Sequence, residues 1–321
     1  MKNVTKTNAM FALMVVIYIL MLFGLAAIPD SIVISSDVLL VVPELILMIP
    51  GLIFIMVFKA ESAEDVRFGG LSIKQILLII MITYTVMPIT SVLNMLTSMG
   101  VESAGDVIAD TASLMPAWKM ILYVAVVPAV CEEFLFRGLI YHGYRRRNRF
   151  VAILLSSVLF GLIHMNVNQF SYAFTIGIVM SLLVEITGSM WSSMLMHFLF
   201  NGTNVGLVYF LNYVNKFVNT DYVAGESATQ SADSAAVTWA TGIYSVVLYA
   251  GLVVVAVCMF ILAMRELIKI SGKRDDFKSL FSKEERITFK NEGRFADGYL
   301  FAGIIPAVGF ILFQEVLMRM L

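Results

Sequence analysis

Charged residues are scarce in this sequence. Asp, Glu, Lys and Arg make up 14% of the 321 residues and hydrophobic residues 60%, whereas a soluble domain typically has about 25% charged and about 45–50% apolar residues. This composition excludes an ordinary soluble domain and indicates an integral membrane protein. The formal net charge is −1, so the chain has no excess of positive charge to attract nucleic acid, which is not expected among its partners.

Cysteine is scarcer still. The two cysteines, Cys131 and Cys258, both lie in apolar runs, and neither belongs to a CxxC pair. This number and spacing argue against a disulfide framework and against a zinc site built on thiolates.

Long apolar runs, by contrast, recur along the chain, and a helix needs about 20 mostly apolar residues to cross a membrane. The fifth and sixth runs are short and are separated by the mostly polar residues 166–169, so either eight or nine crossings fit. The predicted fold class is therefore all-α, a polytopic transmembrane helix bundle with eight or nine spanning helices. The candidate spans are 9–28, 38–58, 73–99, 117–141, 150–165, 170–187, 191–213, 238–264 and 298–318.

Lys and Arg are unevenly distributed among the loops that these spans define. If the N-terminus is cytoplasmic, 18 of the 22 basic residues fall in cytoplasmic segments, all except Lys119, Arg137, Lys216 and Arg319. Because cytoplasmic loops are enriched in Lys and Arg, this distribution predicts a multi-pass protein with a cytoplasmic N-terminus. Its location would be the cell (plasma) membrane if the chain is bacterial, with membrane lipid as its surrounding partner.

A few ionisable or strongly polar side chains lie inside the candidate spans, where a charge is costly unless it pairs, lines a cavity or takes part in chemistry. Residues four apart share a helix face, so Glu133 can pair with Arg137, and His197 points the same way as Asn201. A rise of about 1.5 Å per residue puts the three helices' polar groups at overlapping depths, nearer the cytoplasmic half. The set that we single out is Glu132, Glu133, Arg137, His164, His197 and Asn201.

These residue types suit hydrolysis of a peptide bond. A carboxylate and an imidazole that face one water can polarise it and take its proton, and a second imidazole with an amide can donate hydrogen bonds to an oxyanion. The same set could instead bind a divalent metal such as zinc through Glu132, His164 and His197, because glutamate with two histidines is a common catalytic zinc set. The sequence leaves both mechanisms open.

Three short motifs in this region resemble those of the CPBP family, which includes the type II CAAX prenyl endopeptidases and bacteriocin-processing relatives. Residues 132–137 match EExxxR, residues 160–164 match FxxxH and residues 197–201 match HxxxN, in the order of the family. The resemblance covers roughly residues 117–205.

The resemblance implies an intramembrane endopeptidase of the CAAX prenyl protease type and a role for each motif residue. Glu132 and His164 would activate the water, and His197 and Asn201 would stabilise the oxyanion. The second glutamate and the arginine of EExxxR would support the site as an ion pair. The family is described both as metal-dependent and as metal-free, and the substrate would be a peptide or a lipidated protein.

Under this interpretation the chain has three parts. Residues 1–116 are N-terminal transmembrane helices, and residues 117–213 form the CPBP-type catalytic core. Residues 214–321 contain an outer loop, a transmembrane helix, a cytoplasmic basic segment and a final transmembrane helix.

Simpler interpretations exist for each residue taken alone, because ion pairs and histidines also tie membrane helices together. Glu185, near the end of the sixth span, is expected to be structural. Residues 145–149 are expected to be a topology signal in contact with lipid headgroups, with His142 solvated beside them. For the whole protein the alternative is a non-catalytic membrane scaffold or a bacteriocin self-immunity protein of the same fold. A secondary transporter would need paired half-length helices, which the sequence does not show.

Overall fold

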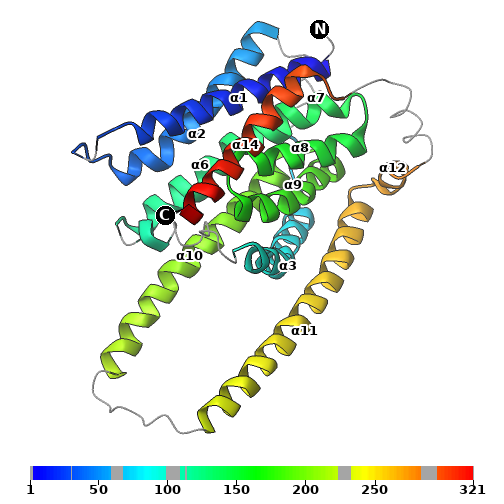
Figure 1. Ribbon diagram of the computed structural model, residues 1–321. Helices are drawn as coiled ribbons and strands as arrows, with labels where there is room; N and C mark the ends of the chain where they lie inside the picture. Colours follow the sequence, from blue (N-terminus) through cyan, green and yellow to red (C-terminus); the bar gives the residue numbers. More distant parts are fainter. Residues whose placement is uncertain are drawn as a thin grey trace.

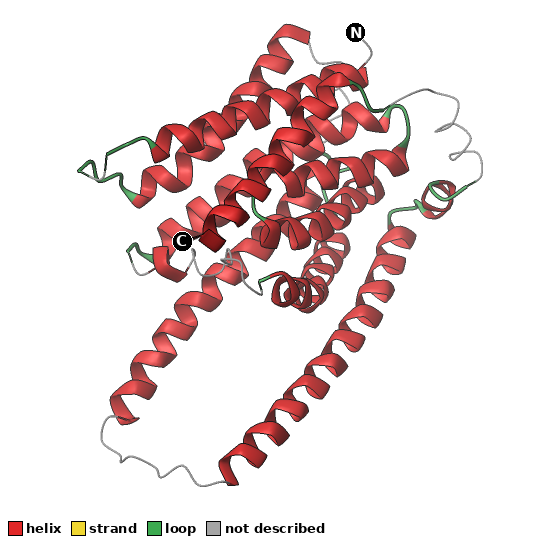
Figure 2. Cartoon of the chain, in the orientation of Figure 1, coloured by secondary structure: helices red, strands yellow, loops and turns green. Residues whose placement is uncertain are grey.

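The structure is a computed structural model that describes residues 3–29, 31–58, 68–98, 109–112, 114–222, 233–282 and 295–320. These residues are almost entirely helical, and one isolated bridge joins Phe68 to Ser189 (Figure 2). The predicted all-α membrane bundle is therefore confirmed. Part of the expected outer loop, residues 223–232, and part of the basic segment, residues 283–294, lie outside the described residues.

Each of the nine predicted spans corresponds to helical structure. Seven helices are long and apolar enough to cross a membrane, and the other two expected spans are α8, with 15 residues, and a helical run made of five consecutive segments. Whether eight or nine segments cross stays a prediction. The seven are α1 (Asn3–Ala26), α2 (Ser36–Phe58), α3 (Ile73–Thr97), α9 (Val167–Thr187), α10 (Met190–Tyr222), α11 (Asp233–Ile270) and α14 (Gly298–Met320); α8 is Arg149–Ile163.

The fourth expected span is one helical run over residues 117–145 with two stretches of π-helix. Wide π-helical turns are rare and occur frequently at functional sites. Here they flank the short α-helical segment that carries the two adjacent glutamates. The run consists of α5 (Ala117–Met120), η2 (Ile121–Val126), α6 (Val127–Glu133), η3 (Phe134–Tyr141) and α7 (His142–Arg145).

This fourth run lies at the centre of the bundle. Its middle segments pack against α2, α8, α9 and α10, and the face of η3 that meets these helices is fully buried. Around this centre α1 packs against α2 and α14, while α3 packs against α9 and α11 (Figure 1). The polar residues of the fourth run are thereby shielded from lipid by other helices.

In contrast, α11 stands at the edge of the bundle. Only 11% of its most apolar window is buried, and it packs mainly on α3 (Figure 1). An apolar helix with so little protein contact is suited to lie against lipid tails, which are as apolar as its own side chains.

Several basic segments meet at one end of the bundle. The Tyr144 hydroxyl donates to Asn8 Oδ1 at 2.6 Å, and the Asn8 amide donates to the Phe295 carbonyl at 2.9 Å. Arg149 donates to Ser279 in α12 (Arg274–Ser279) at 2.7 Å. The start of α1, the α7–α8 turn, α12 and the start of α14 therefore share this end, as the predicted distribution of Lys and Arg requires (Figure 1).

Candidate active site

The two adjacent glutamates at the end of α6 point in different directions. At 3.6 residues per turn, consecutive side chains are about 100° apart around a helix. Both residues are buried, Glu133 with 0% and Glu132 with 7% of its surface exposed. Glu133 faces Arg137, whereas Glu132 faces a cavity. The first glutamate is thus available for a ligand, and the second is part of the packing around it.

Glu133 and Arg137 form the ion pair that their spacing predicts. Arg137 Nη1 lies 2.7 Å from Glu133 Oε1, and Nη2 donates to the carbonyl of Gly177 in α9 at 3.2 Å. The guanidinium carbon is 4.3 Å from the centre of the Phe160 ring. A Cβ on Gly177 would come within 3.2 Å of Arg137 Nη2 and 3.1 Å of Ser157 Cβ, so the glycine allows α9 to approach this pair closely.

His197, on α10, lies between the two glutamates. Its Nδ1 is 2.9 Å from Glu133 Oε1, and its Nε2 is 3.7 Å from Glu132 Oε2. A carboxylate only accepts hydrogen bonds, so Nδ1 carries a proton and donates it to Glu133. The Glu133–Arg137 pair therefore fixes the orientation of the His197 ring and directs Nε2 toward Glu132.

His164 ends α8, at the turn that leads into α9. Its Nδ1 lies 2.8 Å from the carbonyl of Phe160, which can only accept, so this nitrogen carries the proton and Nε2 has a free lone pair. Nε2 lies 4.0 Å from Glu132 Oε1. The next residue, Met165, has a φ of 52°, the only positive φ outside glycine in the described residues. Such left-handed backbone is unfavourable for a branched or bulky side chain and often marks a functional turn.

Asn201 lies one turn beyond His197 on the same face of α10. Its Nδ2 donates to the carbonyl of Val124 in η2 at 2.9 Å, which ties α10 to the first π-helical stretch. A primary amide has two N–H donors, so one of them remains available after this bond. The spacing in the sequence predicts the shared face, but not the bond to η2.

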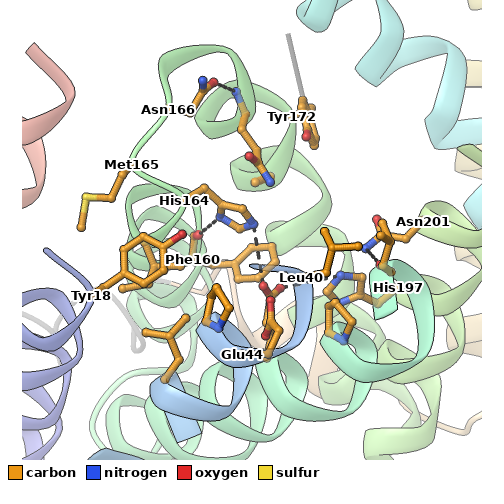
Figure 3. Close-up of a pocket in the computed structure, with 18 of the residues that line it drawn as sticks. Tyr18, Leu40, Glu44, Phe160, His164, Met165, Asn166, Tyr172, His197 and Asn201 are labelled. Atoms are coloured by element: carbon orange, nitrogen blue, oxygen red, sulfur yellow. Dashed lines mark hydrogen bonds and ion pairs between the residues drawn. The ribbon is translucent and has the colours of Figure 1, made fainter. Parts of the chain in front are cut away.

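Glu132, His164, His197 and Asn201 all line one cavity of about 460 Å³. They come from α6, the α8–α9 turn and α10, and in Figure 3 His164, His197 and Asn201 surround the same space. The cavity volume is in the range of small-molecule and peptide side-chain sites. The four side chains that the sequence singles out therefore converge on one cavity within the helical bundle.

Glu44 also lines this cavity, and the three motifs do not predict it. It belongs to α2 and lies in the same cavity (Figure 3). Its carboxyl group lies within hydrogen-bonding reach of that of Glu132. One oxygen of each carboxyl, Oε2, is buried without a hydrogen-bond partner. The sequence does contain a signal for it, because a glutamate within an apolar run is unusual. Glu44 lies far from the three motifs in the sequence, however, and belongs to a different span, so its position in the site is not predicted.

The residues do not have the arrangement of a metal site. In the described part of the chain, no group of three His, Cys, Asp or Glu side chains is arranged to hold a metal ion. The separations of 3.7 and 4.0 Å between Glu132 and the two histidines exceed the spacing of neighbouring ligands on a zinc ion with bonds of about 2.0–2.2 Å. We therefore derive no step through a metal, and the predicted requirement for a divalent ion stays a prediction.

A second charged cluster lies at the basic end of the fourth helical run. Glu185 accepts from Arg145 Nε at 2.6 Å and from the Tyr141 hydroxyl, and it also lies 3.4 Å from Arg149 Nη1. This agrees with the structural role expected for Glu185. Arg145 and Arg149 thus bind a protein carboxylate, in addition to any role in topology. The prediction that His142 is solvated is wrong, because tight packing of α7 leaves it 7% exposed.

Comparison with known proteins identifies relatives for this central region. Residues 114–203 match the model of a family described as "Type II CAAX prenyl endopeptidase Rce1-like". Over 95 residues the chain is 30% identical to the "Putative membrane peptidase YdiL" of Bacillus subtilis (strain 168), and this match covers 29% of the chain and 38% of the relative. The chain thus matches well under half the length of that curated relative. No solved structure matches the chain.

Proposed function

We propose that this chain is an intramembrane endopeptidase of the CPBP family of membrane proteases, a proposal supported by its three motifs and by the match of residues 114–203. The observation that carries the proposal is the convergence of Glu132, His164, His197 and Asn201 on a single cavity among the helices. The substrate would be a peptide or a lipidated protein held in the surrounding membrane.

The proposed nucleophile is a water bound between Glu132 and His164. Glu132 Oε1 and His164 Nε2 are 4.0 Å apart, so one water can hydrogen-bond to both. The proton on His164 Nδ1 is bound to the Phe160 carbonyl, which leaves Nε2 as an acceptor for that water. The carboxylate takes the proton of the water as hydroxide adds to the carbonyl carbon, and the proton then passes to the leaving amide nitrogen as the C–N bond breaks.

The proposed oxyanion donors are Asn201 and His197, which lie one turn apart on α10 and line the same cavity. Asn201 retains one N–H after its bond to Val124. Glu133, held by Arg137, accepts from Nδ1 and orients the His197 ring, so that Nε2 faces the cavity and, when it carries a proton, can donate to the oxyanion. Fixed donors directed at a developing negative charge are commonly the largest single contribution to catalysis.

The proposed orientation puts the basic end of the bundle in the cytoplasm. The start of α1, the α7–α8 turn and α12, which all carry basic residues, share this end, which supports a cytoplasmic N-terminus under the positive-inside rule (Figure 1). In a bacterium the protein would lie in the cell membrane.

The direct test is cleavage by the purified full chain in detergent or vesicles. A panel of prenylated and unprenylated peptides, each with and without a chelator, would give the substrate class and the metal requirement together. We expect Glu132→Ala to abolish cleavage without loss of folding, because it removes the group that takes the proton of the water. If cleavage were lost in the presence of chelator and returned on addition of zinc, the mechanism would be metal-dependent.

The matched control is Glu266→Gln. Glu266 is an exposed residue of α11 paired with Lys269 at 3.2 Å, so its replacement removes a carboxylate without touching the cavity. A Glu132→Ala rate equal to that of the unmodified chain would contradict the proposal. If the biological phenotype survived replacement of Glu132, His164 and His197 together, the non-catalytic scaffold or self-immunity protein would be the better description.

A further inference from the structure

The cavity contains one more carboxyl group than the three motifs supply. Glu44 reaches it from α2, which lies outside the segment matched by the family model. Its carboxyl and that of Glu132 lie within hydrogen-bonding reach of each other. Glu44 thus adds a second carboxyl group beside that of Glu132 in the lining of the cavity. The substrate therefore meets an acidic wall that the catalytic motifs alone do not create.

Apart from the imidazoles of His164 and His197, no basic side chain belongs to the described lining of the cavity. None of the lining residues is Lys or Arg. Arg137 lies behind the cavity, fully buried, and is bound to Glu133. Lys119, near the outer end of the same helical run, is bound to Asp37 at 3.0 Å. The other polar groups of the lining include uncharged carboxamides, those of Asn166, Gln169, Asn204 and Gln314.

The charge imbalance has a direct consequence for the substrate. The Oε2 atoms of Glu44 and Glu132 are buried and have no hydrogen-bond donor among the described residues, so the two carboxyl groups act on a substrate in the cavity through their charge. A cationic group would be attracted, whereas a second anion would meet a like charge in a site with low dielectric walls. A free carboxylate close to the cleaved bond would have no basic partner here.

We propose that Glu44 is a specificity-determining residue that selects substrates with a basic side chain beside the cleaved bond and disfavours an acidic side chain or a free carboxylate there. This inference rests on the proposed endopeptidase function and adds a substrate class to it. Glu44 acts on the choice of substrate through its charge, while Glu132 and His164 act on the water.

The experiment uses the full-length protein in vesicles and lipid-anchored peptides of one sequence. Mass spectrometry first locates the cleaved bond, and the residue that follows it is then varied among Lys, Gln and Glu. Because like charges brought together cost several kcal/mol in an interface, we expect kcat/KM for the Lys peptide to exceed that for the Glu peptide at least about tenfold. The Gln peptide should fall between them and serves as the internal reference.

Glu44→Gln keeps the shape of the side chain and removes its charge. We expect it to reduce the Lys-to-Glu ratio severalfold, whereas Glu44→Asp, which keeps the charge, should retain the order of the three peptides. Glu266→Gln should behave like the unmodified chain. An unmodified chain that cleaves all three peptides equally, or a Glu44→Gln variant with the original ratio, would overturn the inference. Failure to cleave any peptide would count against the proposed function itself.

Discussion

The two charged clusters on the fourth helical run have similar side chains but different hydrogen bonding. The inner cluster, formed by Glu132, Glu133, Arg137 and His197, leaves buried atoms without partners, namely Oε2 of both glutamates and Nε of the arginine. In the border cluster of Tyr141, Arg145, Arg149 and Glu185, no buried atom that the structure describes lacks a partner. Unsatisfied buried polar groups are costly. Only Glu132 and His197 of the inner cluster line the cavity, where a ligand can reach them, whereas the hydrogen bonds of the border cluster fit a structural contact.

The largest effect is expected from breaking the inner ion pair. Arg137→Met leaves Glu133 buried without its cation, and removal of one partner of a buried pair typically destabilises a protein by about 3–5 kcal/mol. The double variant Glu133→Met/Arg137→Met should recover most of this loss, because it removes both buried charges. It should still not cleave, since His197 Nδ1 loses the acceptor that orients the ring. Thermal unfolding in detergent and peptide cleavage measure the two effects separately.

If the double variant unfolded as readily as Arg137→Met, the pair would not be the source of the lost stability. Recovery of cleavage in the double variant would show that the orientation of His197 does not depend on Glu133. Either result would weaken the distinction between the two clusters.

A smaller effect is expected from His164→Ala. Its Nε2 lies 4.0 Å from Glu132 Oε1, and its ring lies at the end of α8, edge-on to that of Phe160 at 5.0 Å. Removal of a general base or acid typically slows a reaction by about 10²–10⁴-fold, and the unfolding temperature should change little. The measurement is kcat/KM on the reference peptide together with thermal unfolding. A rate within a factor of about two of the unmodified chain would remove His164 from the proposed mechanism.

The sequence predicts the helical bundle because long apolar runs leave few alternatives in a membrane. It also predicts which side chains gather in the site, since spacings of four place Glu133 with Arg137 and His197 with Asn201. It does not predict the two π-helical stretches of the fourth run, because they depend on packing between helices. Nor does it predict that Glu44 would meet Glu132, because which face of α2 is turned inward is decided by tertiary contacts such as that of Gly51 with Leu135.

The border cluster gives the smallest predicted effect, and the most direct comparison with the inner one. Glu185→Gln removes the carboxylate that binds Arg145 and Arg149, but 40% of the Arg145 side chain is exposed, so solvent screens much of the interaction. We expect a loss of about 1 kcal/mol in the free energy of unfolding, reduced further by added salt. Cleavage should be unchanged, because Glu185 lines a separate cavity of about 470 Å³ and not the one that holds Glu132. If Glu185→Gln abolished cleavage but left the free energy of unfolding unchanged, the border cluster would belong to the catalytic mechanism. Buried polar atoms without hydrogen-bond partners would then not distinguish a catalytic site from a structural contact in this protein.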